Sequence, residues 1–209
     1  MPLMIGSGDI KPYIRWGVRE NLWQYSSAEG PVEFDIEAEP FVLDIQGLTL
    51  GWLKIDAGRE WLEWPSLYEP LADPNPQNAP VKEWKRGFAV ELMSRKLWGE
   101  ETVREFSSNA AGALAFATGV YNMCEKDHLD DLMAGKCPVI RITGAPSKKV
   151  GMGTTRDIQF TIEKMIDRPS EFTRVAVEIR NPKGSAQPAP TPKQETAPAA
   201  KPVESDEEF

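Results

Sequence analysis

The chain has 209 residues, of which 41% are hydrophobic, so it is long enough for one folded domain of ordinary size followed by a tail. Its formal net charge is -8, from 24 Lys and Arg against 32 Asp and Glu, and this balance taken alone disfavours binding to nucleic acid. The N-terminus has no signal-peptide pattern and no apolar run is as long as a membrane span, so we expect a cytoplasmic protein without a membrane partner.

Strand signals dominate the first half of the chain. Interleaved aromatic, aliphatic and β-branched residues predict strands within 13–25, 32–36 and 41–55. The Pro- and Asn-rich segment 72–80 predicts a long exposed loop. After this loop, the alternating apolar residues of 85–94 predict another strand, and a further strand is expected over 102–106.

The period of the pattern changes after residue 106. Small and apolar residues at three- and four-residue steps predict a helix as far as Cys124, with Ser107 or Ser108 as its N-cap. Strand signals return at 138–143 and 156–166, on either side of a loop that contains Gly, Pro and Lys.

This order of elements predicts a mainly β fold. Strands, then one helix, then two strands fit the OB-fold, a five-stranded Greek-key barrel, with the helix between the third and fourth strands. The extra material at 1–31 and 60–80 is then an addition to the barrel. We expect the barrel domain to occupy residues 1–180.

The C-terminal segment has a different composition. Residues 181–203 are rich in Pro, Ala and small polar residues, and such a sequence cannot offset chain entropy by burying surface, so we predict a disordered, extended linker. Residues 204–209 form an acidic tip that ends in one aromatic residue. An aromatic side chain on a mobile tether predicts a contact with a partner protein. The predicted partner-binding residues are Asp206, Glu207, Glu208 and Phe209.

Positive charge is concentrated locally despite the negative total. The segment 136–156 has five Lys or Arg and no Asp or Glu, and a second group of cations surrounds Phe88. Several of the seven Trp residues are next to cations in the sequence. Bases of a single strand stack on aromatic faces while Lys and Arg hold the phosphates, so this pattern favours single-stranded nucleic acid. The predicted DNA-binding residues are Arg15, Trp16, Trp84, Lys85, Arg86, Arg95, Lys96, Trp98, Arg104, Lys148, Lys149 and Arg156.

Each of these assignments has a structural alternative. Core packing is expected for Trp23, Trp52 and Trp64, and it is the alternative to base stacking for the three Trp residues of the predicted site. The loop with Lys148 and Lys149 is interpreted as a hairpin that grips phosphates, with a solvated turn as the alternative. The glycines that follow have no Walker spacing, so nucleotide hydrolysis is not supported.

The chain also contains residue types that can bind metal ions. Cys124, His128 and Cys137, with Asp127 or Asp130, offer zinc ligands, but the spacing matches none of the usual structural sites. Two cysteines are too few for a disulfide framework, so we interpret both as free thiols.

The tripeptide 83–85 matches the Glu-x-Lys pattern of metal-dependent nucleases, but the nearest upstream acid, Asp73, lies in the Pro-rich loop. We therefore expect no cofactor and no enzymatic activity, with a metal-dependent nuclease kept as the alternative.

The linker, the acidic tip ending in Phe209 and the segment WKRGFAVELMSRKLWGEETVREFSSNAAGALAFATGVY, residues 84–121, resemble single-stranded DNA-binding proteins of bacteria and especially of their phages. The resemblance implies an OB-fold body that binds DNA without sequence preference in replication, recombination or repair, inside a bacterial host cell. It also implies that the tip docks on replication and recombination proteins, with the Phe in an apolar pocket and the carboxylates on a basic rim. A tail-based interaction adaptor is a further alternative, and homo-oligomerisation and a preference for DNA or RNA stay open.

Overall fold

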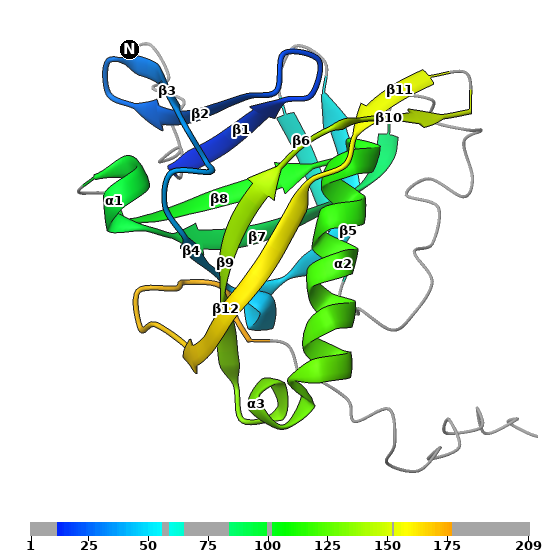
Figure 1. The fold of residues 1–209 in the computed structure, drawn as a ribbon. Helices are drawn as coiled ribbons and strands as arrows, with labels where there is room; N and C mark the ends of the chain where they lie inside the picture. Colours follow the sequence, from blue (N-terminus) through cyan, green and yellow to red (C-terminus); the bar gives the residue numbers. More distant parts are fainter. Residues whose placement is uncertain (1–11, 56–58, 65–83, 100–101, 152, 177–209) are drawn as a thin grey trace, which may run out of the picture. The chain divides into compact units, whose positions relative to one another are not determined.

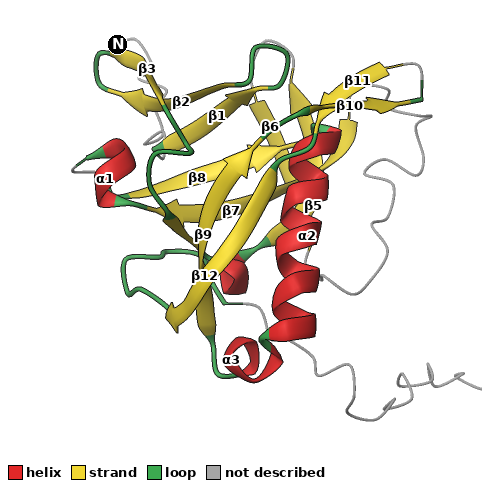
Figure 2. Cartoon of the chain, viewed as in Figure 1, coloured by secondary structure: helices red, strands yellow, loops and turns green. Residues whose placement is uncertain are grey.

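The structure is a computed structural model that describes residues 12–55, 59–64, 84–99, 102–151 and 153–176. All of these lie in the first of the two units into which the chain divides, Met1–Ile179, and the second unit is Arg180–Phe209. Strands make up 52% and helices 21% of the described residues, which confirms the mainly β class. Within the first unit, Figures 1 and 2 show a curled sheet with one long helix packed against it.

The strands agree in large part with the sequence pattern. In chain order they are β1 (Tyr13–Gly17), β2 (Leu22–Ser27), β3 (Gly30–Phe34), β4 (Phe41–Leu43), β5 (Thr49–Ile55), β6 (Arg59–Trp64), β7 (Trp84–Met93), β8 (Val103–Ser108), β9 (Lys136–Gly144), β10 (Ser147–Val150), β11 (Gly153–Arg156) and β12 (Gln159–Asp167). The predicted region 13–25 divides into two strands, and 41–55 is interrupted by the 3-10 turn η1 (Ile45–Gly47). Strand β6 was not predicted.

Strand β7 is the centre of the main sheet. Its C-terminal half pairs with β8 on one edge, while β4 and β5 share the other edge one after the other. The sheet has ten strands in the order β12-β9-β4-β7-β8-β1-β2-β3, with β5 joined to β7 and β6 joined to β5. Strands β10 and β11 form a separate two-stranded hairpin. The main sheet therefore has more strands than the five that the sequence pattern predicted.

The turn between β1 and β2 explains why one predicted strand became two. Asn21 has a φ of 56°, a left-handed conformation that Asn tolerates better than most residues, and its side chain accepts a hydrogen bond from Trp16 Nε1 at 3.1 Å. The reversal places Trp16 opposite Trp23, and their rings stack with centroids 5.4 Å apart. Both indoles are therefore part of the core.

The described helices are α1 (Arg95–Trp98), α2 (Ala111–Asp127) and α3 (Leu129–Met133). Helix α2 is the predicted one, and it buries Phe116 and Val120 against the sheet. The predicted N-cap was wrong, because Ser107 and Ser108 remain in β8 and Ala110 caps the helix. None of the helices in this part of the chain is long and apolar enough to cross a membrane.

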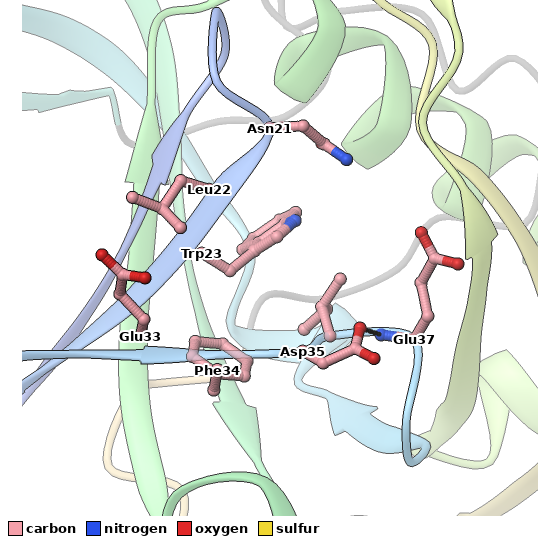
Figure 3. Close-up of a pocket in the computed structure, with 8 residues that line it drawn as sticks. Asn21, Leu22, Trp23, Glu33, Phe34, Asp35 and Glu37 are labelled. Carbon is pink, nitrogen blue, oxygen red and sulfur yellow. Dashed lines mark hydrogen bonds between the residues drawn. The ribbon is translucent and has the colours of Figure 1, made fainter.

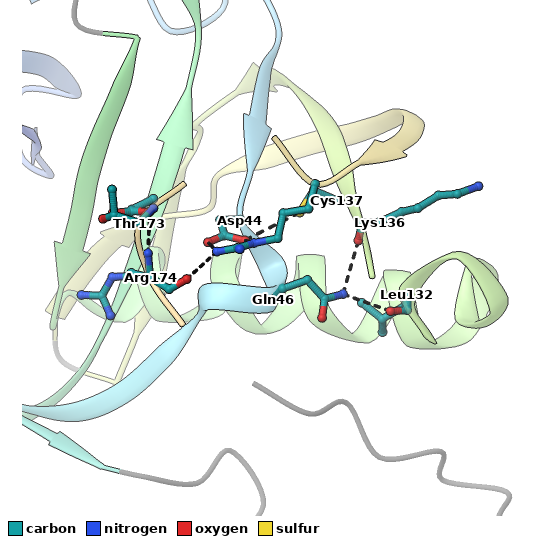
Figure 4. Close-up of polar contacts among 9 residues, drawn as sticks. Asp44, Gln46, Leu132, Lys136, Cys137, Thr173 and Arg174 are labelled. Atoms are coloured by element: carbon teal, nitrogen blue, oxygen red, sulfur yellow. Dashed lines mark hydrogen bonds and ion pairs between the residues drawn. The ribbon is translucent and has the colours of Figure 1, made fainter. Parts of the chain in front are cut away.

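Buried charges fasten the segment after β12 to the sheet (Figure 4). Arg168 donates from Nε and Nη2 to the carboxylate of Asp44 at 2.7 and 2.8 Å, and Asp44 is fully buried. The hydrogen bond to Asp44 raises the pKa of Arg168 above its ordinary value. Glu91 on β7 accepts hydrogen bonds from the backbone N–H groups of Thr173 and Arg174. These contacts are structural, because each charge is compensated inside the protein.

Candidate nucleic-acid interface

Strands β5 and β7 carry aromatic and cationic side chains beyond the end of the core. Directly opposite residues of antiparallel strands share a face, and Trp52 lies opposite Arg86 while Lys54 lies opposite Trp84. The guanidinium carbon of Arg86 lies 5.6 Å from the centre of the Trp52 ring. Both Trp residues are half-buried, and Arg86 is exposed. We call these four residues the β5–β7 arm.

The β10–β11 hairpin is the second cationic feature. Lys148 and Lys149 lie opposite Thr155 and Thr154, and both lysines are exposed. Lys148 forms an ion pair with Asp157 at 3.3 Å, with more than a third of each side chain exposed to solvent. Such an exposed pair contributes little free energy, so a phosphate can replace the carboxylate. The predicted hairpin is therefore present, with its cations directed to solvent.

Arg156, at the end of the same hairpin, has a structural role instead of the predicted phosphate contact. Its guanidinium donates to the backbone carbonyls of Val18, Arg19 and Ala145 at 2.9, 3.1 and 3.0 Å. These bonds fix the base of the hairpin to the turn between β1 and β2. We therefore correct this assignment, because three of the five guanidinium N–H groups, one on each nitrogen, are already bound to backbone carbonyls.

The β10–β11 hairpin and the part of β7 next to Arg86 both lie close to the N-terminal end of α2. A Cβ atom added to Gly112 in the first turn of this helix would lie 2.1 Å from the carbonyl oxygen of Arg156, so the helix and β11 are in close contact. At the same end, a Cβ on Gly87 of β7 would lie 2.8 Å from the carbonyl oxygen of Ser108. Figure 1 shows β10 and β11 at the same end of the unit as β6. One end of the unit thus presents both sets of cations.

Three other predicted site residues are buried, and their assignments are corrected. Trp16 and Trp98 are 8% and 3% exposed, and Trp98 Nε1 donates to the Thr102 carbonyl at 2.7 Å. Arg104 is 3% exposed, lies over the Tyr25 ring and donates to the Ser26 carbonyl at 2.6 Å. All three side chains are buried within the protein, so none of them is available to a nucleic acid in this conformation.

The remaining predicted cations are exposed but dispersed. Lys85 lies on β7 next to Arg86, on the other face of the strand. Arg15 points away from the core on β1. Arg95 and Lys96 lie on α1, where Lys96 binds Glu39 at 3.0 Å. Arg15, Arg95 and Lys96 therefore lie on other elements than the arm.

A pocket beside β2 and β3 has the opposite charge. It has a volume of about 350 Å³ and is lined by Trp23, Phe34 and three acidic side chains, those of Glu33, Asp35 and Glu37 (Figure 3). A phosphate would be repelled by these carboxylates. This pocket therefore does not belong to the candidate interface.

The proposed metal ligands do not form a site. Cys124 and Cys137 are free and fully buried, and burial raises the pKa of each thiol to about 12, so both are protonated at neutral pH. No group of three or more potential ligands is found within the described ranges. Of the Glu-x-Lys pattern, Glu83 lies outside the described residues, as do Asp73 and the four residues of the acidic tip.

The sequence interpretation missed two members of the arm. Trp52 was assigned to the core and Lys54 was not singled out, because their proximity to Arg86 and Trp84 depends on the direct pairing of β5 with β7, two strands that are far apart in the sequence. Trp64, also assigned to the core, is half-buried on β6. Comparison of the chain with protein-family models, curated proteins and solved structures gave no match.

Proposed function

We propose that this protein binds single-stranded DNA without strong sequence preference, through an OB-fold-like body, and acts in DNA replication, recombination or repair, as expected of a phage-encoded protein of this class. The observation that carries the proposal is the placement of the β5–β7 arm and the separate β10–β11 hairpin near the N-terminal end of α2. Half-buried aromatic rings beside solvent-exposed cations, as Trp52 and Trp84 lie beside Arg86, are the combination that a sequence-tolerant single-strand binder uses.

The strand order supports an OB-like arrangement. If β4 with β5 is the first strand, then β7, β8, β9 and β12 are the second to fifth, and α2 lies between the third and fourth. The neighbours in the sheet then follow the order fifth, fourth, first, second, third. The far edge of β8 pairs with β1 in parallel instead of closing on β12, so the sheet remains open there. The β1–β3 meander is the N-terminal addition.

In this arrangement the β5–β7 arm and the β10–β11 hairpin correspond to binding regions of OB-folds. OB-folds bind oligonucleotides with the second and third strands and with the loops that join the first to the second and the fourth to the fifth. The arm lies where the first strand leads to the second, and the hairpin joins β9 to β12, the fourth to the fifth. Both features therefore occupy connections that such folds use for binding.

A titration of the intrinsic Trp fluorescence with oligo-dT and oligo-U tests the proposal. We expect saturable quenching by oligo-dT, weakened by salt, because phosphate contacts release counterions. Comparison of the affinities for oligo-dT and oligo-U shows whether the protein prefers DNA or RNA. Absence of binding to any single strand would overturn the proposal.

Incubation of the labelled DNA with protein and magnesium separates the alternative functions. Retarded but intact DNA supports a binding protein, whereas fragments support the metal-dependent nuclease. An interaction adaptor neither retards nor cleaves the DNA. A catalytic role would be assigned only if Glu83→Gln abolished the cleavage.

The acidic tip completes the proposed function as a recruitment site for replication and recombination proteins. Phe209→Ala keeps the negative charge of the tip and removes the aromatic anchor, so we expect loss of partner capture with unchanged DNA affinity. Deletion of residues 204–209 also removes electrostatic competition for DNA, and affinity should rise at low salt. If both variants capture the same partners as the full chain, the tip has no recruiting role.

A further inference from the structure

A cavity of about 330 Å³ lies between α2 and strands β5 and β7. Its apolar lining consists of Leu48, Leu50, Phe88, Leu114 and Ala117. Its polar lining comes from one side of α2, namely Thr118, Tyr121, Asn122 and Glu125. The cavity is therefore apolar towards the sheet and polar along the helix.

The cavity is continuous with the β5–β7 arm. Leu50 and Phe88, which line it, lie opposite each other in the β5–β7 ladder. Side chains two residues apart in a strand share a face, so Trp52 and Arg86 form the next pair on the same face. A strand held by the arm would therefore pass next to the cavity.

The polar groups of the cavity match a base edge better than a phosphate. Asn122 and Glu125 are three residues apart on α2 and so lie on the same side of the helix. The carboxylate accepts hydrogen bonds and repels phosphate, whereas the amide donates as well as accepts. Cytosine and adenine present an exocyclic amino donor beside a ring-nitrogen acceptor. Thymine presents an N–H between two carbonyl oxygens, which a carboxylate disfavours.

We propose that this cavity receives one base of the bound single strand and favours cytosine or adenine, an inference that rests on the DNA-binding function proposed above. The apolar wall formed by Phe88 and Leu50 covers the ring of the base, and Glu125 with Asn122 contacts its edge. The neighbouring nucleotide then lies at Trp52 and Arg86. The protein is thereby sequence-tolerant along most of the strand, with a weak preference at one position.

The test uses the full chain and labelled oligo-dC and oligo-dT of equal length, compared by fluorescence anisotropy at one salt concentration. For the natural protein we expect oligo-dC to bind about fivefold more tightly, the effect of one additional hydrogen bond. Thr118→Phe fills the cavity from an exposed position, so it should abolish this preference. Met123→Phe is the matched control, because Met123 is exposed on the same helix and does not line the cavity.

A second pair of variants tests the base-edge contact itself. Glu125→Gln should reduce the preference for oligo-dC, because glutamine accepts and donates and no longer discriminates. Asp127→Asn removes the same charge from an exposed position outside the cavity and should leave the ratio of the two affinities unchanged.

Each outcome separates the two proposals. If the natural protein binds neither oligonucleotide, the proposed function fails. If it binds both equally and Thr118→Phe changes nothing, only the base-receiving cavity is overturned. It is also overturned if Thr118→Phe alters the oligomeric state measured by light scattering, because the cavity would then be a contact between copies of the chain.

Discussion

The two halves of β7 differ in their surroundings although they are one continuous strand. Phe88, Val90 and Leu92 share a face and are at most 1% exposed. Trp84 and Arg86 continue the same face towards the N-terminus, where Trp84 is half-buried and Arg86 is exposed. Alternation determines which face a side chain occupies, but whether that face is covered depends on the elements packed against it. The strand therefore runs from the candidate site into the core.

Arg86 on β7 and Arg104 on the neighbouring strand β8 show the same contrast between an exposed and a buried position. Arg86 and Arg104 each lie over an aromatic ring, Trp52 and Tyr25 respectively. Arg104 is buried and bound to a backbone carbonyl, whereas Arg86 is exposed. A cation beside an aromatic residue is consequently not sufficient evidence for a binding site. Burial and hydrogen bonding decide which of the two belongs to the candidate site.

The largest effect is expected for Phe88→Ala. Removing this ring leaves a cavity against Phe106, with which it forms an edge-to-face pair, and should lower the free energy of unfolding by about 3–5 kcal/mol. Denaturant unfolding followed by circular dichroism measures the loss. The matched Trp84→Ala should change stability much less. Equal losses for the two variants would remove the distinction between the halves of β7.

Arg104→Ala should have the second largest effect, and again on stability. Loss of the charged hydrogen bond to Ser26 should lower the free energy of unfolding by about 1.5–3 kcal/mol. The salt dependence of DNA binding should stay the same, because this guanidinium is not available to phosphate. Arg86→Ala should show the reverse pattern, with normal stability and weaker binding. A reduced salt dependence for a folded Arg104→Ala would return this residue to the interface.

The fold was partly predictable because the strands and α2 carry strong local periodicity. The pattern around Phe88 identified β7 and its buried face. The N-cap of α2 was misplaced because Ser107 and Ser108 fit a cap locally, whereas pairing with β7 keeps both in β8. Strand β6 has no clear alternation of its own and follows from its pairing with β5. Tertiary contacts override local preference in both cases.

The candidate site was less predictable because adjacency in sequence is not proximity on a surface. Arg15 and Trp16 are neighbours, but in a strand they point to opposite faces, so only Arg15 is exposed. Arg156 looked available, yet its partners lie at Val18 and Arg19, far away in the sequence. Conversely, Trp52 joins Arg86 only through the sheet register. The residues of the candidate site that the sequence analysis named, Trp84, Arg86, Lys148 and Lys149, are each next to another aromatic or cationic residue in the sequence.

Trp84→Ala tests the exposed half of β7 directly. If this ring stacks on a base, its loss should cost about 1–3 kcal/mol of binding free energy for oligo-dT, with the fold intact. Trp84→Phe keeps an aromatic face and should recover most of the affinity, which separates stacking from a general disturbance of the arm. Fluorescence anisotropy of a labelled oligonucleotide gives the affinities. Unchanged binding by a folded Trp84→Ala would remove this residue from the site.

The smallest effect is expected at the hairpin and appears most clearly as a change of slope. Lys148→Ala with Lys149→Ala removes two exposed cations, and each phosphate contact to a single strand contributes about -0.7 to the slope of log K against log salt. The slope should therefore flatten by about 1.4 for all sequences alike, because backbone contacts do not identify bases.

The matched control is Lys126→Ala with Lys164→Ala, since both lysines are exposed and lie on α2 and β12, away from the hairpin. This control changes the net charge by the same amount. It therefore shows how much of the change in slope comes from the net charge of the protein and how much from the hairpin itself. Equal flattening in both double variants would mean that net charge alone is responsible. An unchanged slope in the hairpin variant would make β10–β11 a solvated turn and leave the β5–β7 arm as the site of phosphate contact.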